Sequence, residues 1–142
     1  MSASAANLYR RLADAALTKT KALPAAAAGN NTDSIDLGQT TLGPLADEME
    51  LVVEIEATPS LVDDKTITLT IKDSADDSTF AAIPSLATLV QTGASSAGAA
   101  AASRRYKLPP TTRRYVRVYA DVLTDGGDNT AKSYTAKLLA NP

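Results

Sequence analysis

Three stretches of the chain alternate between apolar and polar residues over most of their length. They are residues 49–57, 65–72 and 115–122, with glutamates, threonines, or tyrosine and arginine on their polar positions. Successive side chains of a strand point to opposite faces, so this alternation predicts strands with one buried and one solvated face, as in antiparallel sheets. The side chains expected to share one core are Leu51, Val53, Ile55, Ile67, Leu69, Ile71, Val116 and Val118.

Shorter segments with strand character surround these three stretches. Residues 34–37 end at Gly38, residues 105–108 end at two prolines, and residues 133–140 close the chain. Polar turns at 73–78 and 125–129 separate the segments. About seven or eight short strands joined by turns are typical of a β-sandwich or jelly roll. We therefore predict a mainly β fold, an antiparallel β-sandwich or jelly roll, over residues 32–142.

Residues 1–31 have a different composition and are predicted to form an N-terminal arm. They are rich in Ala, Ser, Asn and Lys and end in the flexible stretch 25–31. Leu8 and Leu12 lie at helical spacing, whereas residues 16–21 fit an extended strand equally well. Large apolar groups are too few here to offset the chain entropy lost on docking. We expect the arm to be mobile in the free protein and ordered on assembly.

Composition narrows the chemistry that the chain can perform. Its 142 residues suit one domain, its net charge is −2, and it contains neither Cys nor His. Thiolate and imidazole chemistry, and the usual ligands of transition metals, are therefore absent. No apolar run reaches the roughly 20 residues of a membrane span, and residues 1–28 do not resemble a signal peptide. We expect a soluble protein made inside a cell, with no catalytic residue, metal or cofactor, and not an enzyme.

Two acidic groups could hold a ligand or be ordinary solvated residues. Asp73, Asp76 and Asp77 have the oxygens that Ca²⁺ prefers, but the EF-hand pattern is missing, and acids of this kind also cap turns. The glutamates of residues 50–56 could take part in glycoside chemistry. They share one strand face without an aromatic platform nearby, which favours a solubilising face or an interface for a basic partner.

The basic and aromatic residues concentrate in one segment, which is our candidate site. Tyr115, Arg117 and Tyr119 share one face of a predicted strand, and Arg114 precedes it. Arg and Tyr are enriched in protein–protein hot spots, so a protein interface is the preferred interpretation. A plain solvated face and a single-stranded nucleic-acid site remain alternatives, the second opposed by the net charge. The arm adds further candidate interface residues: Leu8, Tyr9, Arg10, Arg11 and Leu12.

The order of these segments resembles the jelly-roll capsid cement (decoration) proteins of tailed bacteriophages. The resemblance lies in the sequence of strands at 33–38, 49–55 and 66–71, the turn 73–80, a Gly-rich loop, the prolines at 109–110 and the strand 114–118. It covers residues 33 to 140.

The resemblance implies a jelly roll that binds the outer surface of the assembled capsid shell and reinforces it. Its partners would be the major capsid protein and further copies of itself, as a dimer or trimer, with no nucleic acid or membrane partner. It would be made in the host cytoplasm and reside on the outer capsid surface of the virion. The alternative is a carbohydrate- or ligand-binding β-sandwich module. Galactose-binding modules have a similar Asp-Ser turn before Phe, but usually carry stacking aromatics, which are only 4% of this chain.

Overall fold

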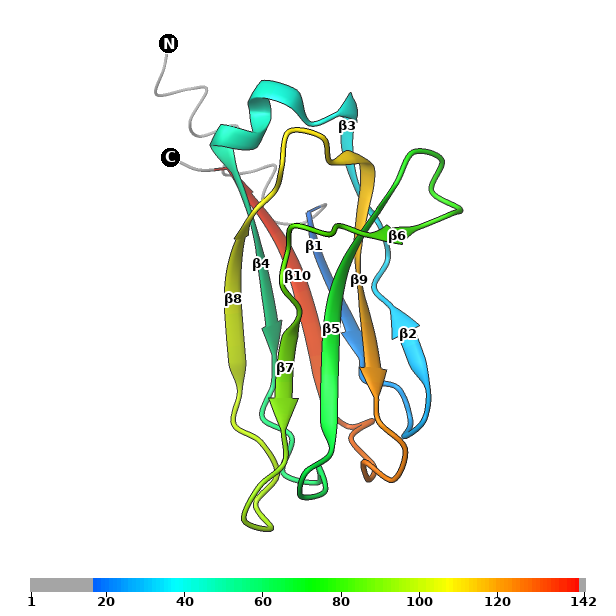
Figure 1. The fold of residues 1–142 in the computed structure, drawn as a ribbon, viewed down its shortest axis with the longest axis vertical. Helices are drawn as coiled ribbons and strands as arrows, with labels where there is room; N and C mark the ends of the chain where they lie inside the picture. Colours follow the sequence, from blue (N-terminus) through cyan, green and yellow to red (C-terminus); the bar gives the residue numbers. More distant parts are fainter. Residues whose placement is uncertain (1–16, 141–142) are drawn as a thin grey trace.

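A computed structural model describes residues 17–140, which form two packed antiparallel sheets (Figure 1). Sheet A contains, in spatial order, β1 (Thr18–Ala22), β10 (Ser133–Ala140), β4 (Met49–Ile55) and β8 (Ala102–Lys107). Sheet B contains β2 (Gly29–Asn31) and β3 (Ile35–Thr41), which both pair with β9 (Arg113–Val122). It continues with β5 (Thr66–Ser74), which also pairs with β6 (Ala81–Ala82) and β7 (Leu89–Thr92). A 3-10 helix, η1 (Gly43–Glu48), precedes β4, and no helix of residues 17–140 is long and apolar enough to cross a membrane.

The strand pairs are nested along the chain, from the outermost pair of segments to the innermost. β1 pairs with β10, β2 and β3 with β9, β4 with β8, and β5 with β6 and β7. The pairs β10–β4 and β9–β5 then complete the two sheets. When β2 with β3, and β6 with β7, each count as one interrupted strand, this is the connectivity of an eight-stranded jelly roll. The predicted fold class, a mainly β antiparallel sandwich, is confirmed.

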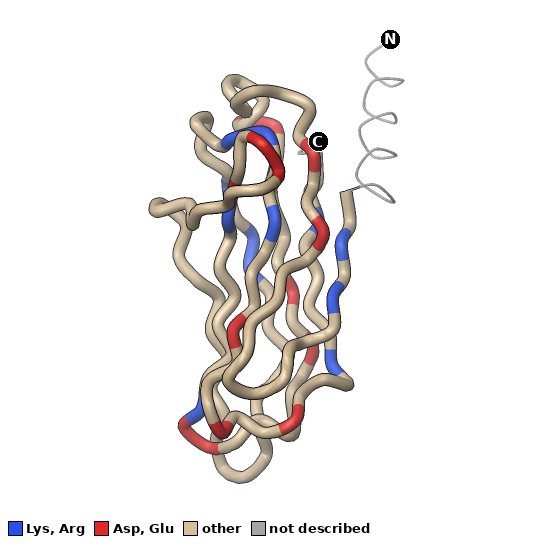
Figure 2. Tube along the Cα trace, turned by 90° about the vertical axis from the view of Figure 1, so that its right-hand side faces the viewer, with Lys and Arg blue, Asp and Glu red and all other residues tan. Residues whose placement is uncertain are grey.

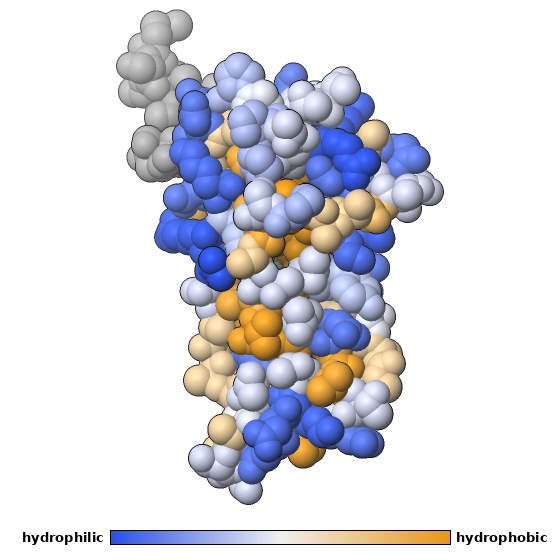
Figure 3. Space-filling model, in the orientation of Figure 1, coloured by the Kyte–Doolittle hydropathy of each residue, from blue (hydrophilic) through white to orange (hydrophobic). Residues whose placement is uncertain are grey.

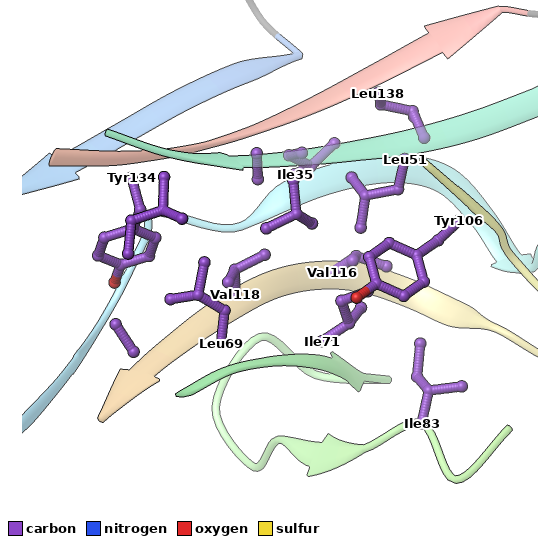
Figure 4. Packing of buried hydrophobic residues seen from close by; sticks show 14 of the residues in the cluster. Ile35, Leu51, Leu69, Ile71, Ile83, Tyr106, Val116, Val118, Tyr134 and Leu138 are labelled. Atoms are coloured by element: carbon purple, nitrogen blue, oxygen red, sulfur yellow. The ribbon is translucent and has the colours of Figure 1, made fainter. Parts of the chain in front are cut away.

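The predicted alternation sets which face of each long strand is buried. Every residue assigned to the core from β4, β5 and β9 is at most 4% exposed. The register brings Leu69 opposite Ala120 and Ile71 opposite Val118 in sheet B, so their side chains pack toward sheet A (Figure 4). Tyr134 is also buried, and its hydroxyl donates a 2.7 Å hydrogen bond to Asn30 Oδ1. The core is thus mainly aliphatic, with the phenol of Tyr134 hydrogen-bonded at its margin.

A buried glutamine holds together the loops at the lower end of the sandwich. Gln91 in β7 is 4% exposed and accepts a 2.9 Å hydrogen bond from the Thr58 hydroxyl. Its amide nitrogen donates to the main-chain carbonyls of Glu56 and Ala100. The β4–β5 and β7–β8 loops are therefore fastened to each other. A buried polar group of this kind must be satisfied, which makes the arrangement specific.

Two boundaries differ from those predicted. β3 continues to Thr41 beyond Gly38, because this glycine adopts a φ of +74° at a register shift in the pairing with β9. Residues 17–31 are not part of an arm: β1 is an edge strand of sheet A, β2 pairs with β9, and Leu23 is 2% exposed. Backbone pairing, the buried Leu23 and Pro24, and the partly buried Leu17 and Ala26 dock this apolar-poor segment, so the domain begins at or before residue 17. The interface expected at Leu8, Tyr9, Arg10, Arg11 and Leu12 lies outside the described residues.

Two truncations test this boundary. Deleting residues 2–16 should leave the free energy of unfolding nearly unchanged, because both sheets lie within the rest of the chain. Deleting residues 2–23 removes β1 and Leu23 as well, and should lower it by at least about 2 kcal/mol, the lower end for loss of a buried leucine. Urea denaturation of both proteins measures the difference. Equal stability of the two truncations would contradict the position of β1.

Candidate protein-binding face

Tyr115, Arg117 and Tyr119 lie in a row on the outer face of sheet B. They alternate along β9 with the buried Val116 and Val118, and all three are half-buried. We call this row the Tyr-Arg ladder. The strand periodicity that buries the valines necessarily turns the ladder outward. The structure therefore places these three predicted site residues together, on a regular strand at the centre of a sheet.

Two further residues complete the face, and the sequence pattern did not identify them. Lys72 of β5 lies opposite Arg117 in the β5–β9 register. Its ammonium nitrogen is 4.1 Å from the centre of the Tyr119 ring. The centre of the Phe80 ring, from the turn before β6, lies 3.7 Å from the guanidinium carbon of Arg117. Each cation is thus held against an aromatic ring, an attractive arrangement that fixes the long side chain in place.

The two arginines at the start of β9 bind acidic residues of the neighbouring strands. Arg114 forms a two-point ion pair with Asp36 of β3, with distances of 2.8 and 2.9 Å. This hydrogen bonding is the main cause that lowers the pKa of Asp36 to about 2. Arg113 binds the Asp73 carboxylate at 2.9 Å and its carbonyl oxygen at 2.8 Å. Both arginines fasten neighbouring strands to β9, so the positive charge of Arg114, a predicted interface residue, is already neutralised.

Two of the three acids considered for Ca²⁺, Asp73 and Asp76, already bind other groups of the protein. The Asp73 carboxylate accepts from Arg113, as described above. Asp76 accepts hydrogen bonds from the Thr79 amide, the Ser74 hydroxyl and the Ser78 amide, and these bonds, the one from Thr79 most of all, lower its pKa to about 2. Residues 17–140 contain no group of three or more acids placed to hold a metal ion. The geometry fits the turn-capping interpretation.

The glutamates of β4 lie on the outer face of sheet A, as predicted. Glu50 pairs with Arg105 at 2.9 Å, and Glu54 pairs with Lys137 at 2.8 Å. Glu56 accepts a hydrogen bond from the amide of Ser133. An open trough on this face is lined by Thr20, Glu54, Ile55, Glu56, Ala101, Ala102, Ser103, Ser133 and Thr135. None of these lining residues is aromatic, so the trough offers no ring on which a sugar could stack.

The two outer faces therefore differ in character. The face of sheet A neutralises its charges by pairing them across strands, whereas the ladder of sheet B combines rings with cations. In the view of Figure 2 basic and acidic residues both lie along the strands, and acidic residues also occur in loops at both ends. Apolar groups reach the surface in separate patches in the view of Figure 3. Among residues 17–140, the exposed large hydrophobics are Val62, Val90 and Leu123.

One protein family and several solved structures are similar to this chain over most of its described length. A family model described as Bbp16 matches residues 17–138. A search of the curated proteins finds no match. Among solved structures, the PBSX exported protein XepA superposes with a TM-score of 0.55 at 14% identity. The match covers 87% of this chain and 36% of XepA, so the chain spans little more than a third of that protein, and the likeness concerns the fold.

Two further solved structures are more distant. A pilus protein of Bacillus endospore appendages has a TM-score of 0.38 at 10% identity, covering 88% of this chain and 86% of that one. A family GH115 4-O-methyl-α-glucuronidase also has a TM-score of 0.38, at 14% identity, covering 88% of this chain and 14% of the enzyme. At these scores neither structure bears on function.

A glycine substitution tests how the ladder is built. The Tyr119 phenol lies over Gly29 of β2, where a Cβ atom would overlap the ring. Gly29→Ala should displace Tyr119 and separate it from Lys72, while changing the free energy of unfolding by less than about 1 kcal/mol, as is usual for surface substitutions. Nuclear Overhauser contacts between the Lys72 side chain and the Tyr119 ring measure the effect. Contacts of unchanged intensity in Gly29→Ala would show that the ring is held differently.

Proposed function

This chain belongs to the Bbp16 family, and we propose that it is a capsid decoration (cement) protein. It binds the outer surface of an assembled phage capsid shell and stabilises that shell. Its partners are the major capsid protein and further copies of itself, and its place is the outer surface of the virion. The observation that carries the proposal is the Tyr-Arg ladder, an aromatic and basic row displayed on the open face of a jelly roll.

The fold supports this proposal. The resemblance to phage cement proteins implied a jelly roll, and residues 17–140 have the jelly-roll connectivity. The PBSX exported protein XepA shares the fold over 87% of this chain. A fold alone does not assign a function, so the proposal depends on the face that the fold presents.

The chemistry of that face suits binding to a protein surface. Tyr and Arg provide large contact areas and directional hydrogen bonds, and they dominate the binding energy of many interfaces. Here they project from a regular strand paired on both sides, so little conformational freedom is lost when a partner binds. Decoration requires no reactive group, and the whole sequence contains neither His nor Cys. We accordingly propose a structural protein rather than an enzyme.

The energetics of decoration follow from mass action. A protein that binds the assembled shell but not the free subunits stabilises the assembly by about 2.7 kcal/mol per site when its free concentration is 100 times its Kd. An oligomer that engages several capsid subunits at once gains further affinity through effective concentration. Modest contacts at each ladder can therefore reinforce a whole shell.

Co-sedimentation with empty capsid shells from the source of the chain tests the proposal. The full chain should pellet with assembled shells and remain in the supernatant with unassembled capsid protein. Tyr115→Ala and Tyr119→Ala should each weaken shell binding at least tenfold, about 1.4 kcal/mol. Thr135→Ala, on the outer face of sheet A, is the matched control and should bind like the wild type. A wild-type protein that stays in the supernatant with intact shells would refute decoration.

A further inference from the structure

Two positive charges face each other across the centre of sheet B. Lys72 of β5 and Arg117 of β9 are direct cross-strand partners and share the outer face. Directly opposed side chains start about 5 Å apart at Cβ, and like charges in such positions repel. The outer face of sheet A follows the opposite rule, because there Glu54 pairs with Lys137 and Glu50 with Arg105. The repulsion between Lys72 and Arg117 is thus a local feature of the ladder.

No acid within residues 17–140 neutralises this pair. The four ion pairs found there use Arg105, Arg113, Arg114 and Lys137 as their cations. Neither Lys72 nor Arg117 forms an ion pair or a side-chain hydrogen bond in that part of the chain, and the buried Arg117 Nε has no hydrogen-bond partner there. Asp121 lies on the same face of β9, two residues beyond Tyr119, and is not paired with either cation.

Aromatic rings orient the two cations without cancelling their charge. The Lys72 ammonium lies over Tyr119, and the Arg117 guanidinium lies over Phe80. Both side chains are half-buried, so they have already lost part of their hydration. A carboxylate placed between them would form charge-assisted hydrogen bonds and remove their mutual repulsion. We therefore expect this site to bind a carboxylate more tightly than an isolated surface lysine does.

We propose that Lys72 and Arg117 form a carboxylate-binding pair that docks Asp or Glu side chains of an acidic protein surface. The inference rests on the proposed function, and it assigns the acidic surface to the capsid shell. The neighbouring charges favour a protein over a nucleic acid. Asp121 lies on the same face of β9 as Arg117 and forms no ion pair within residues 17–140, so a continuous row of phosphates would meet this acid, whereas one or two carboxylates between the cations would not.

Shell binding measured at low and high salt tests this pair. Lys72→Gln, Arg117→Gln and the double variant are compared with the wild type in about 50 mM and about 500 mM NaCl, where screening differs strongly. The matched control is Arg105→Gln, which removes an exposed cation from sheet A. Wild type and control should lose affinity as salt rises. The single variants should bind at least tenfold more weakly at low salt, and the double variant should show little salt dependence.

Each outcome of the test distinguishes a failure of the carboxylate-binding proposal from a failure of the decoration proposal. If the double variant is folded and binds shells as tightly as the wild type, the proposal that Lys72 and Arg117 bind carboxylates is wrong, and the proposal of capsid decoration is unaffected. If the wild type does not bind shells, decoration fails, and a titration with hexaglutamate followed by amide NMR shifts decides the pair. Shifts in β5 and β9 that vanish in the double variant would support it. No shifts, or tighter binding to single-stranded DNA than to hexaglutamate, would overturn it.

Discussion

The pairing of β5 with β9 is the contact on which both the core and the binding face depend. On its inner side this pair brings Ile71 opposite Val118, in the hydrophobic core. On its outer side it brings Lys72 opposite Arg117. A slip of one residue in this register would turn the valines outward and bury the cations, which the core does not tolerate. Packing of the inner face therefore fixes the geometry of the outer one.

The rest of the sandwich holds this strand pair at its ends and sides. Arg113 and Arg114 fasten the start of β9 to Asp73 and Asp36. At the other end of the sheets, the buried Gln91 joins two loops by three hydrogen bonds, of which the one from Thr58 is fully buried. The face between these anchors is regular strand throughout. A partner therefore meets a surface whose shape is settled before binding, which reduces the entropic cost of association.

The sequence predicted the parts of the fold that depend on local periodicity. The buried positions of β4, β5 and β9 followed from alternation, as did the common face of Tyr115, Arg117 and Tyr119. It did not predict that residues 17–31 enter both sheets, because their docking depends on backbone pairing rather than on apolar content. Lys72 was missed because its position opposite Arg117 depends on a register between segments distant in sequence, and Phe80 because it reaches the face from a turn.

In the proposed complex, the outer face of sheet B contacts the capsid shell. An electron cryomicroscopy map of shells incubated with the protein is the decisive measurement, because it shows which side of the sandwich is covered. We expect jelly-roll density on the outside of the shell, with the Tyr-Arg ladder against the capsid protein and acidic side chains beside Lys72 and Arg117. Density in which this face points to solvent, with the face of sheet A or the loops against the shell, would contradict it.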